Sequence, residues 1–121
     1  MARIDELNKV LRALQSGTPD SEASALIAED GLIIASALPQ HIEEVRVAGM
    51  SSTLLSLGMR AATELGRGGI EQVMIRGETG YALMVTAAPG TLLLVLATKA
   101  ARLGLIFLDV GRTVELIKKI L

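Results

Sequence analysis

The chain has 121 residues, and half of them are hydrophobic, although only Tyr81 and Phe107 are aromatic. Twelve basic and thirteen acidic residues give a formal net charge of −1. The chain therefore lacks the basic excess that neutralises phosphates, which argues against a nucleic-acid partner. Cysteine is absent, which excludes disulfides, thiol catalysis and thiolate metal sites.

This length predicts a single domain over residues 1–121 with an aliphatic core. A chain without cysteine fits the cytoplasm. The longest apolar runs, Tyr81–Ala88 and Thr91–Ala97, have only the length of a strand, and Pro89-Gly90 separates them. We therefore expect a cytoplasmic protein with no transmembrane segment.

The first expected element is a helix whose apolar residues recur at steps of three and four along one face: Ile4, Leu7, Leu11 and Leu14. Gly17-Thr18-Pro19 is predicted to end it. A hairpin follows, with strands at 23–28 and 32–37 around the turn Glu29-Asp30-Gly31. Asp-Gly between apolar runs favours a hairpin because glycine adopts the positive φ of the turn.

A long helix is expected next, from His41 to Leu65, after Pro39 has ended the second strand. The run Gly66-Arg67-Gly68-Gly69 is predicted to end this helix, with Gly66 as its C-cap.

Three strands joined by short turns are predicted after the glycines, at 70–76, 79–87 and 91–98, followed by a helix at 100–121. Its apolar stripe is expected to comprise Leu103, Phe107, Val110, Val114, Ile117 and Leu121. The expected fold class is α+β, with one five-stranded, mostly antiparallel sheet and helices on both faces.

The long helix is predicted to have two apolar stripes on nearly opposite sides, since successive residues turn by about 100°. The first comprises Val45, Ala48, Ser52, Leu55, Met59 and Ala62. The second comprises Val47, Met50, Leu54, Leu57, Ala61 and Leu65. One stripe can pack on the sheet, and the other would be an exposed apolar patch of the kind that marks an interface. The alternative is that another part of the same chain covers it.

Candidate catalytic and binding groups are few. His41 is the only histidine and has no recognisable partner, so it is interpreted as an exposed residue near a helix start. Neither Gly66-Arg67-Gly68-Gly69 nor Gly77-Glu78-Thr79-Gly80 has the spacing or the strand-to-helix position of a phosphate-binding loop. Arg67 could act as an arginine finger on a partner, but a solvated arginine is the commoner case. We expect no enzyme activity, cofactor or metal.

The pattern resembles the roadblock family, the dynein-light-chain roadblock-type domain, over nearly the whole chain. The resemblance rests on four features together: the hairpin at 25–36, the long helix that ends at Gly66, the strand Glu71–Gly77 and the run Gly80–Val85.

The resemblance implies a profilin-like α+β fold and a homodimer or a heterodimer with a paralogue. The strand after the long helix would pair with its equivalent to form a ten-stranded sheet, and the long helices would pair on one face. The implied interface residues are the second stripe together with Glu71, Val73, Met74 and Ile75. Prokaryotic members resemble regulators of small Ras-like GTPases, so the expected function is a non-catalytic dimeric platform, or scaffold, for such a GTPase.

Two other functions remain open. One is a small-molecule sensor, since sheets flanked by helices also build pockets, although so few aromatic and polar core residues argue against it. The other, implied by the eukaryotic members, is a scaffold subunit associated with dynein or another motor.

Overall fold

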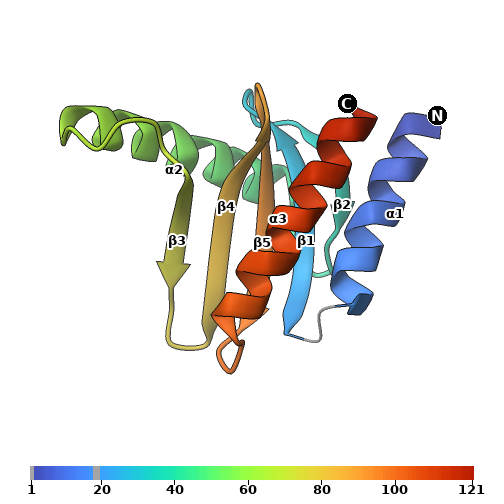
Figure 1. Cartoon of the computed structure of the whole chain (residues 1–121). Coiled ribbons are helices and arrows are strands. Elements are labelled where there is room, and N and C mark those ends of the chain that lie inside the picture. Colours follow the sequence, from blue (N-terminus) through green and yellow to red (C-terminus); the bar gives the residue numbers. More distant parts are fainter. Residues whose placement is uncertain (1, 18–19) are drawn as a thin grey trace.

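The computed structural model describes residues 2–17 and 20–121, which form three helices and five strands in the predicted order (Figure 1). The helices are α1 (Ala2–Gly17), α2 (Glu44–Glu64) and α3 (Leu103–Ile120). The strands are β1 (Ser21–Ala28), β2 (Ile33–Ala37), β3 (Gln72–Arg76), β4 (Gly80–Ala88) and β5 (Thr91–Thr98). Gly17 ends α1 as expected, and the other two residues of that predicted stop, Thr18 and Pro19, lie outside the described residues.

The five strands form one sheet in the order β2-β1-β5-β4-β3, with all neighbours antiparallel. The hairpins β1–β2, β3–β4 and β4–β5 pair strands that follow one another, and the pairing of β1 with β5 joins the two halves of the chain. The edges of the sheet are therefore β2 and β3. This arrangement confirms the predicted fold class.

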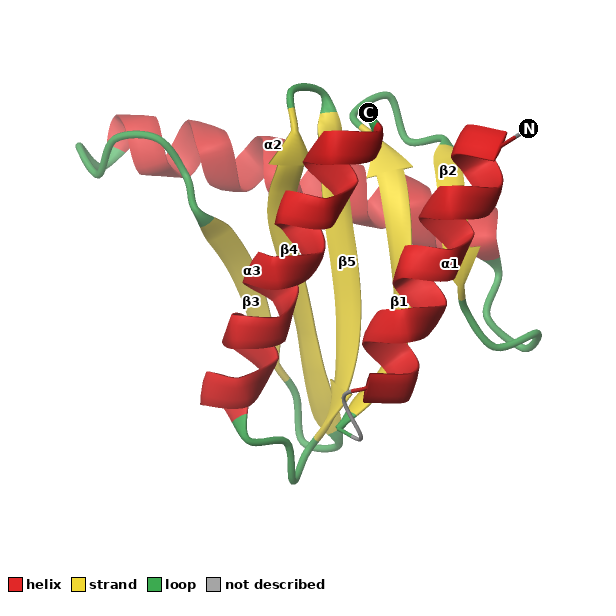
Figure 2. Ribbon diagram, turned by 45° about the vertical axis from the view of Figure 1, so that its right-hand side comes forward, coloured by secondary structure: helices red, strands yellow, loops and turns green. Residues whose placement is uncertain are grey.

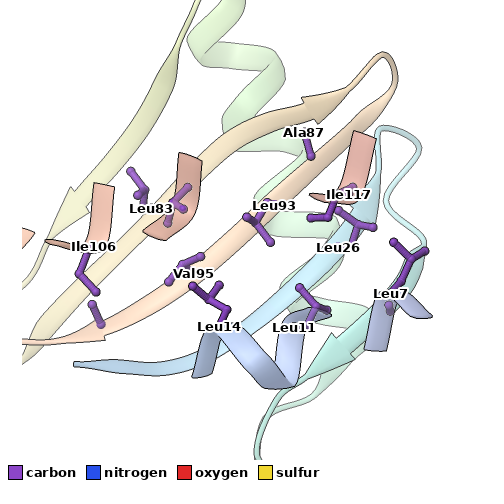
Figure 3. Close-up of a cluster of buried hydrophobic side chains, with 13 residues drawn as sticks. Leu7, Leu11, Leu14, Leu26, Leu83, Ala87, Leu93, Val95, Ile106 and Ile117 are labelled. Carbon is purple, nitrogen blue, oxygen red and sulfur yellow. The ribbon is translucent and has the colours of Figure 1, made fainter. Parts of the chain in front are cut away.

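Two helices, α1 and α3, lie side by side on one face of the sheet, and α2 crosses the other face (Figures 1 and 2). Leu7, Leu11 and Leu14 of α1 pack into the core between α1, α3 and the sheet, together with Ile106 and Ile117 of α3 (Figure 3). Their neighbours from the strands are Leu26, Leu83, Leu93 and Val95. Ile4, which was predicted on the same face of α1, is about half exposed at 48%.

A second, smaller core lies under α2. Ala48 and Leu55 of the helix pack there against buried residues of the strands, namely Ala25, Ile27, Met84, Leu92 and Leu94. The sheet is thus covered on both faces, but α2 crosses only one end of the strands (Figures 1 and 2).

The ends of several elements differ from the prediction. The long helix begins at Glu44 rather than His41, because the chain first turns at Pro39, whose carbonyl accepts the Ile42 N–H at 3.1 Å. Likewise α3 begins at Leu103 rather than Ala100, after a turn in which the Ala101 N–H donates to Thr98. Strand β3 begins two residues later than expected.

The buried face of α3 is rotated from the predicted stripe. Ile106, Val110, Thr113 and Ile117 are buried, whereas Phe107 and Leu121 are substantially exposed. The rotation turns the helix toward α1, because α3 packs against α1 as well as against β4. The Thr113 hydroxyl is satisfied within the helix, where it donates to the Asp109 carbonyl at 2.8 Å.

Candidate interaction surface

The second apolar stripe lies on α2, partly uncovered. Leu57 and Leu65 are 60% and 68% exposed, and Met50 and Ala61 are also exposed. Val47 and Leu54, the stripe residues nearest the sheet, are half-buried at the margin of the core under α2. Within the described residues, no other part of the chain covers the four exposed members.

The first stripe is only partly buried, which corrects the prediction. Ala48 and Leu55 are buried, but Val45 is 82% exposed and Met59 is also exposed. Ser51, which belongs to neither predicted stripe, is buried. The sheet therefore meets α2 along the line of Ala48, Ser51 and Leu55, where small side chains let the helix approach the strands closely.

Strand β3 forms one margin of the sheet and pairs only with β4, from Gln72 opposite Val85 to Arg76 opposite Tyr81. Met74 lies opposite Leu83 and so points to the face that carries α1 and α3, whereas Ile75 lies opposite Ala82 and points to the face that carries α2. Both side chains are exposed, and so is Glu71, just before the strand. The outer N–H and C=O groups of β3 face no strand among residues 2–17 and 20–121.

A glycine brings α2 and β3 together. A Cβ added to Gly58 would lie 2.8 Å from Ile70 Cδ1 and 2.8 Å from Val73 Cγ2, which is too close for any larger residue without a shift. Val73 is consequently half-buried under the helix. A glycine in the middle of a predicted helix is itself a sign of close packing, a signal that the apolar periodicity used above does not contain.

The last turn of α2 extends past β3, away from the rest of the sheet (Figure 1). The C-cap residue of α2 is Leu65 rather than the predicted Gly66. Gly66 follows it with a φ of +68° and ends the helix, while the Arg67 N–H donates to the Ala62 carbonyl at 2.7 Å. The Arg67 side chain turns back to its own helix, where Nε donates to the Leu65 carbonyl at 3.0 Å.

Helix α2 covers only part of the sheet face on which it packs. Along β5, Leu92 and Leu94 are buried but Leu96 is only half-buried, and along β4 burial falls from Met84 to Ala82. On β3, Ile75 is 44% exposed. An apolar shelf, defined here as Ile75, Ala82 and Leu96, therefore remains open beside α2.

The cavities do not resemble a metabolite site. One largely enclosed cavity holds about 100 Å³ and is lined in part by Glu29, Ser52, Met59 and Thr86. Sites for drug-sized ligands are several times larger, and the hollows of about 490 and 530 Å³ are shallow depressions beside α1 and on α2. Among the described residues no group of three His, Cys, Asp or Glu side chains could hold a metal, and His41 is exposed before α2.

Comparison with known proteins identifies the domain. Residues 7–97 match the model of the Roadblock/LC7 domain family. The uncharacterized protein MJ1340 of Methanocaldococcus jannaschii is 39% identical over 112 residues, which cover 93% of this chain and 96% of that protein.

Solved structures match the fold at lower identity. A Roadblock/LC7 domain from Streptomyces avermitilis superposes with a TM-score of 0.87 at 24% identity, covering 93% of this chain and 94% of that chain. The gliding protein MglB of Thermus thermophilus superposes with a TM-score of 0.88 at 20% identity, covering 99% and 91%. No helix within the described residues has the length and apolar character needed to cross a membrane.

Proposed function

Because the chain belongs to the Roadblock/LC7 family, we propose that it acts as a dimeric, non-catalytic platform that binds and regulates a small Ras-like GTPase. The observation that carries the proposal is the coincidence of three uncovered features at one end of the domain. These are the free edge of β3, the exposed stripe of α2 and the apolar shelf.

The edge of β3 supports self-pairing. A twofold axis perpendicular to the sheet and beside β3 would pair this strand with the partner's β3 and join two five-stranded sheets into one of ten. Natural proteins usually protect an edge strand, because its unpaired N–H and C=O groups invite pairing. A symmetric dimer satisfies both edges at once.

The same axis accounts for the stripe and the shelf. It places the two α2 helices on one face, running in opposite directions, with the overhanging end of each above the partner's sheet. The exposed Leu57, Ala61 and Leu65 would then lie over the shelf that the partner's own α2 leaves open. Each protomer's stripe would cover the other protomer's shelf while the two β3 edges pair. One dimer interface would thus account for all three exposed features, which favours a dimer.

The GTPase partner is proposed from the resemblance and from the structural neighbours. Three of the similar structures carry the name MglB, and one of them is described as having a tetrameric arrangement. We propose that the GTPase docks on the face formed by the paired α2 helices. A platform of this non-catalytic kind would change hydrolysis by favouring one conformation of the partner's switch loops.

The test replaces Leu57 by Glu and, as a matched control, Val45 by Glu. Both residues are exposed on α2, but Val45 lies on the side away from the stripe. Light scattering should give the mass of a dimer for the wild type and for V45E, and a shift toward the monomer for L57E.

Binding of a purified Ras-like GTPase from the same organism, loaded with a non-hydrolysable GTP analogue, should fall in L57E alone. If L57E dimerises and binds the GTPase as the wild type does, the proposal is wrong.

A further inference from the structure

The charges of the molecule are unevenly distributed between its two faces. Helices α1 and α3 together contain six basic and four acidic residues, a net charge of +2. The rest of the chain contains six basic and nine acidic residues, a net charge of −3. These two helices lie together on one face of the sheet (Figure 2). That layer is therefore basic within a slightly acidic protein.

The same layer exposes large apolar side chains. Leu105, Leu108 and Leu116 of α3 are each close to half exposed, and they follow one another at helical steps of three and eight along one side of the helix. Phe107 and Leu121 are exposed on its other side. Exposed apolar side chains thus lie on both sides of α3. Together they form a surface that is wider than the narrow stripe that one docked helix would cover.

The cations on this layer are held only weakly by neighbouring acids. Arg112 lies 3.9 Å from Asp109 and Lys118 lies 3.6 Å from Glu115, and the cationic side chains are more than half exposed. Exposed ion pairs of this kind are worth little in water, so these cations can bind other anions at small cost.

We propose that the face formed by α1 and α3 binds the surface of an anionic lipid bilayer. Exposed leucine and phenylalanine side chains among lysines and arginines are the combination with which peripheral proteins bind at the headgroup level. Each basic residue near an anionic membrane adds a modest attraction, which salt screens.

This surface lies on the face of the sheet opposite α2. A dimer built as described under Proposed function would present two copies of it on one side and leave the paired α2 helices free on the other. Tighter membrane binding through two copies rests on that proposed dimer, whereas each protomer carries the complete lipid-binding face by itself.

The test is flotation of the full-length protein with vesicles of 30% phosphatidylglycerol in phosphatidylcholine, and with vesicles of pure phosphatidylcholine. We expect the protein to float only with the anionic vesicles, and binding to fall at least tenfold between 50 and 300 mM salt. The double variant R112Q/K118Q should bind at least fivefold more weakly, and L108Q severalfold more weakly.

Matched controls lie on the other side of the molecule. R46Q/R60Q removes two arginines that are also paired with nearby glutamates on α2, and L32Q replaces an exposed leucine in the β1–β2 turn. Both controls should float as the wild type does. Circular dichroism and thermal melting confirm that each variant is folded.

The proposal is overturned if the wild type fails to float, or if R112Q/K118Q and R46Q/R60Q lose binding equally. It is also overturned if a designed amphipathic helix of Leu and Glu binds this face while vesicles do not, since the partner would then be a protein. Mass and GTPase binding are measured on the same samples. A monomer that floats would contradict the proposed function alone, and a GTPase-binding dimer that does not float would contradict the lipid proposal alone.

Discussion

The two edges of the sheet are treated in opposite ways. At β2, the Ser36 N–H donates to Asn8 Oδ1 of α1 at 3.3 Å, and the Ser36 hydroxyl donates to Glu44 Oε2 at 2.6 Å. Beyond the end of β2, the β1–β2 register would place Glu22 opposite Pro39, which has no N–H. The Glu22 carbonyl instead accepts a hydrogen bond from Gln15 Nε2 at 2.9 Å.

At β3, by contrast, the described residues provide no such side-chain partner for the outer edge of the strand. Its nearest cover is α2, which passes over one face at Gly58 and leaves Met74 and Ile75 exposed. The comparison shows that side chains of α1 and α2 protect the edge at β2. The edge at β3 is left available for pairing, as edge strands used for association require.

The largest expected effect concerns α1, the helix that lies beside the edge strand β2. Leu11 is fully buried between α1 and the sheet. Replacing it by Ala should lower the free energy of unfolding by about 2–5 kcal/mol, because a cavity opens under α1. Urea denaturation at a fixed protein concentration measures the loss. The control I4A, at the exposed end of the same helix, should cost far less, and equal losses would contradict the assigned role of α1.

A substitution at the edge strand β3 should change the affinity of the dimer rather than the stability of the fold. I75K places a charge on the shelf and should weaken the dimer by roughly 2–3 kcal/mol, because an apolar side chain is no longer buried. Analytical ultracentrifugation over a dilution series measures this change. T79K, which puts the same charge in the nearby turn, should leave the dimer intact. A dimer of I75K as tight as the wild type would show that the partner does not bury the shelf.

The position of β3 under α2 can be tested at Gly58. An added methyl group would press on Ile70 and Val73 at a cost of about 1–3 kcal/mol. Alanine in place of glycine regains about 1 kcal/mol in a helix, so we expect G58A to be destabilised by about 1 kcal/mol. Thermal unfolding measures the net effect, and G49A, for which the structure has open space on the same helix, should be stabilised instead.

The smallest expected effect is the loss of one hydrogen bond to the edge strand β2. N8A leaves the Ser36 N–H without its side-chain acceptor and should lower stability by about 0.5–1 kcal/mol. N8D keeps an acceptor oxygen and serves as the control. Amide hydrogen exchange at Ser36 should accelerate in N8A only, and unchanged exchange would mean that Asn8 does not protect this edge.

Local patterns were sufficient to predict the order of the elements, the Asp-Gly hairpin and the end of the long helix at Gly66, because each depends on neighbours a few residues apart. They also predicted that α2 has apolar residues beyond those its own sheet buries. The starts of α2 and α3 were predicted three residues too early, since Pro39 and Ala101 lie in turns that close through backbone hydrogen bonds. Which residues form a dimer interface remains a prediction.

Periodicity along the chain therefore determined which elements form and that one helix carries more apolar surface than a single face needs. It did not determine that α2 buries the line through Ala48, Ser51 and Leu55, that α3 turns Ile106 and Thr113 inward, or that Asn8 covers β2 while β3 stays bare. These outcomes depend on contacts between residues far apart in the chain. A side chain's step along a helix is a local property, whereas the neighbour that covers it is known only once the layers have packed.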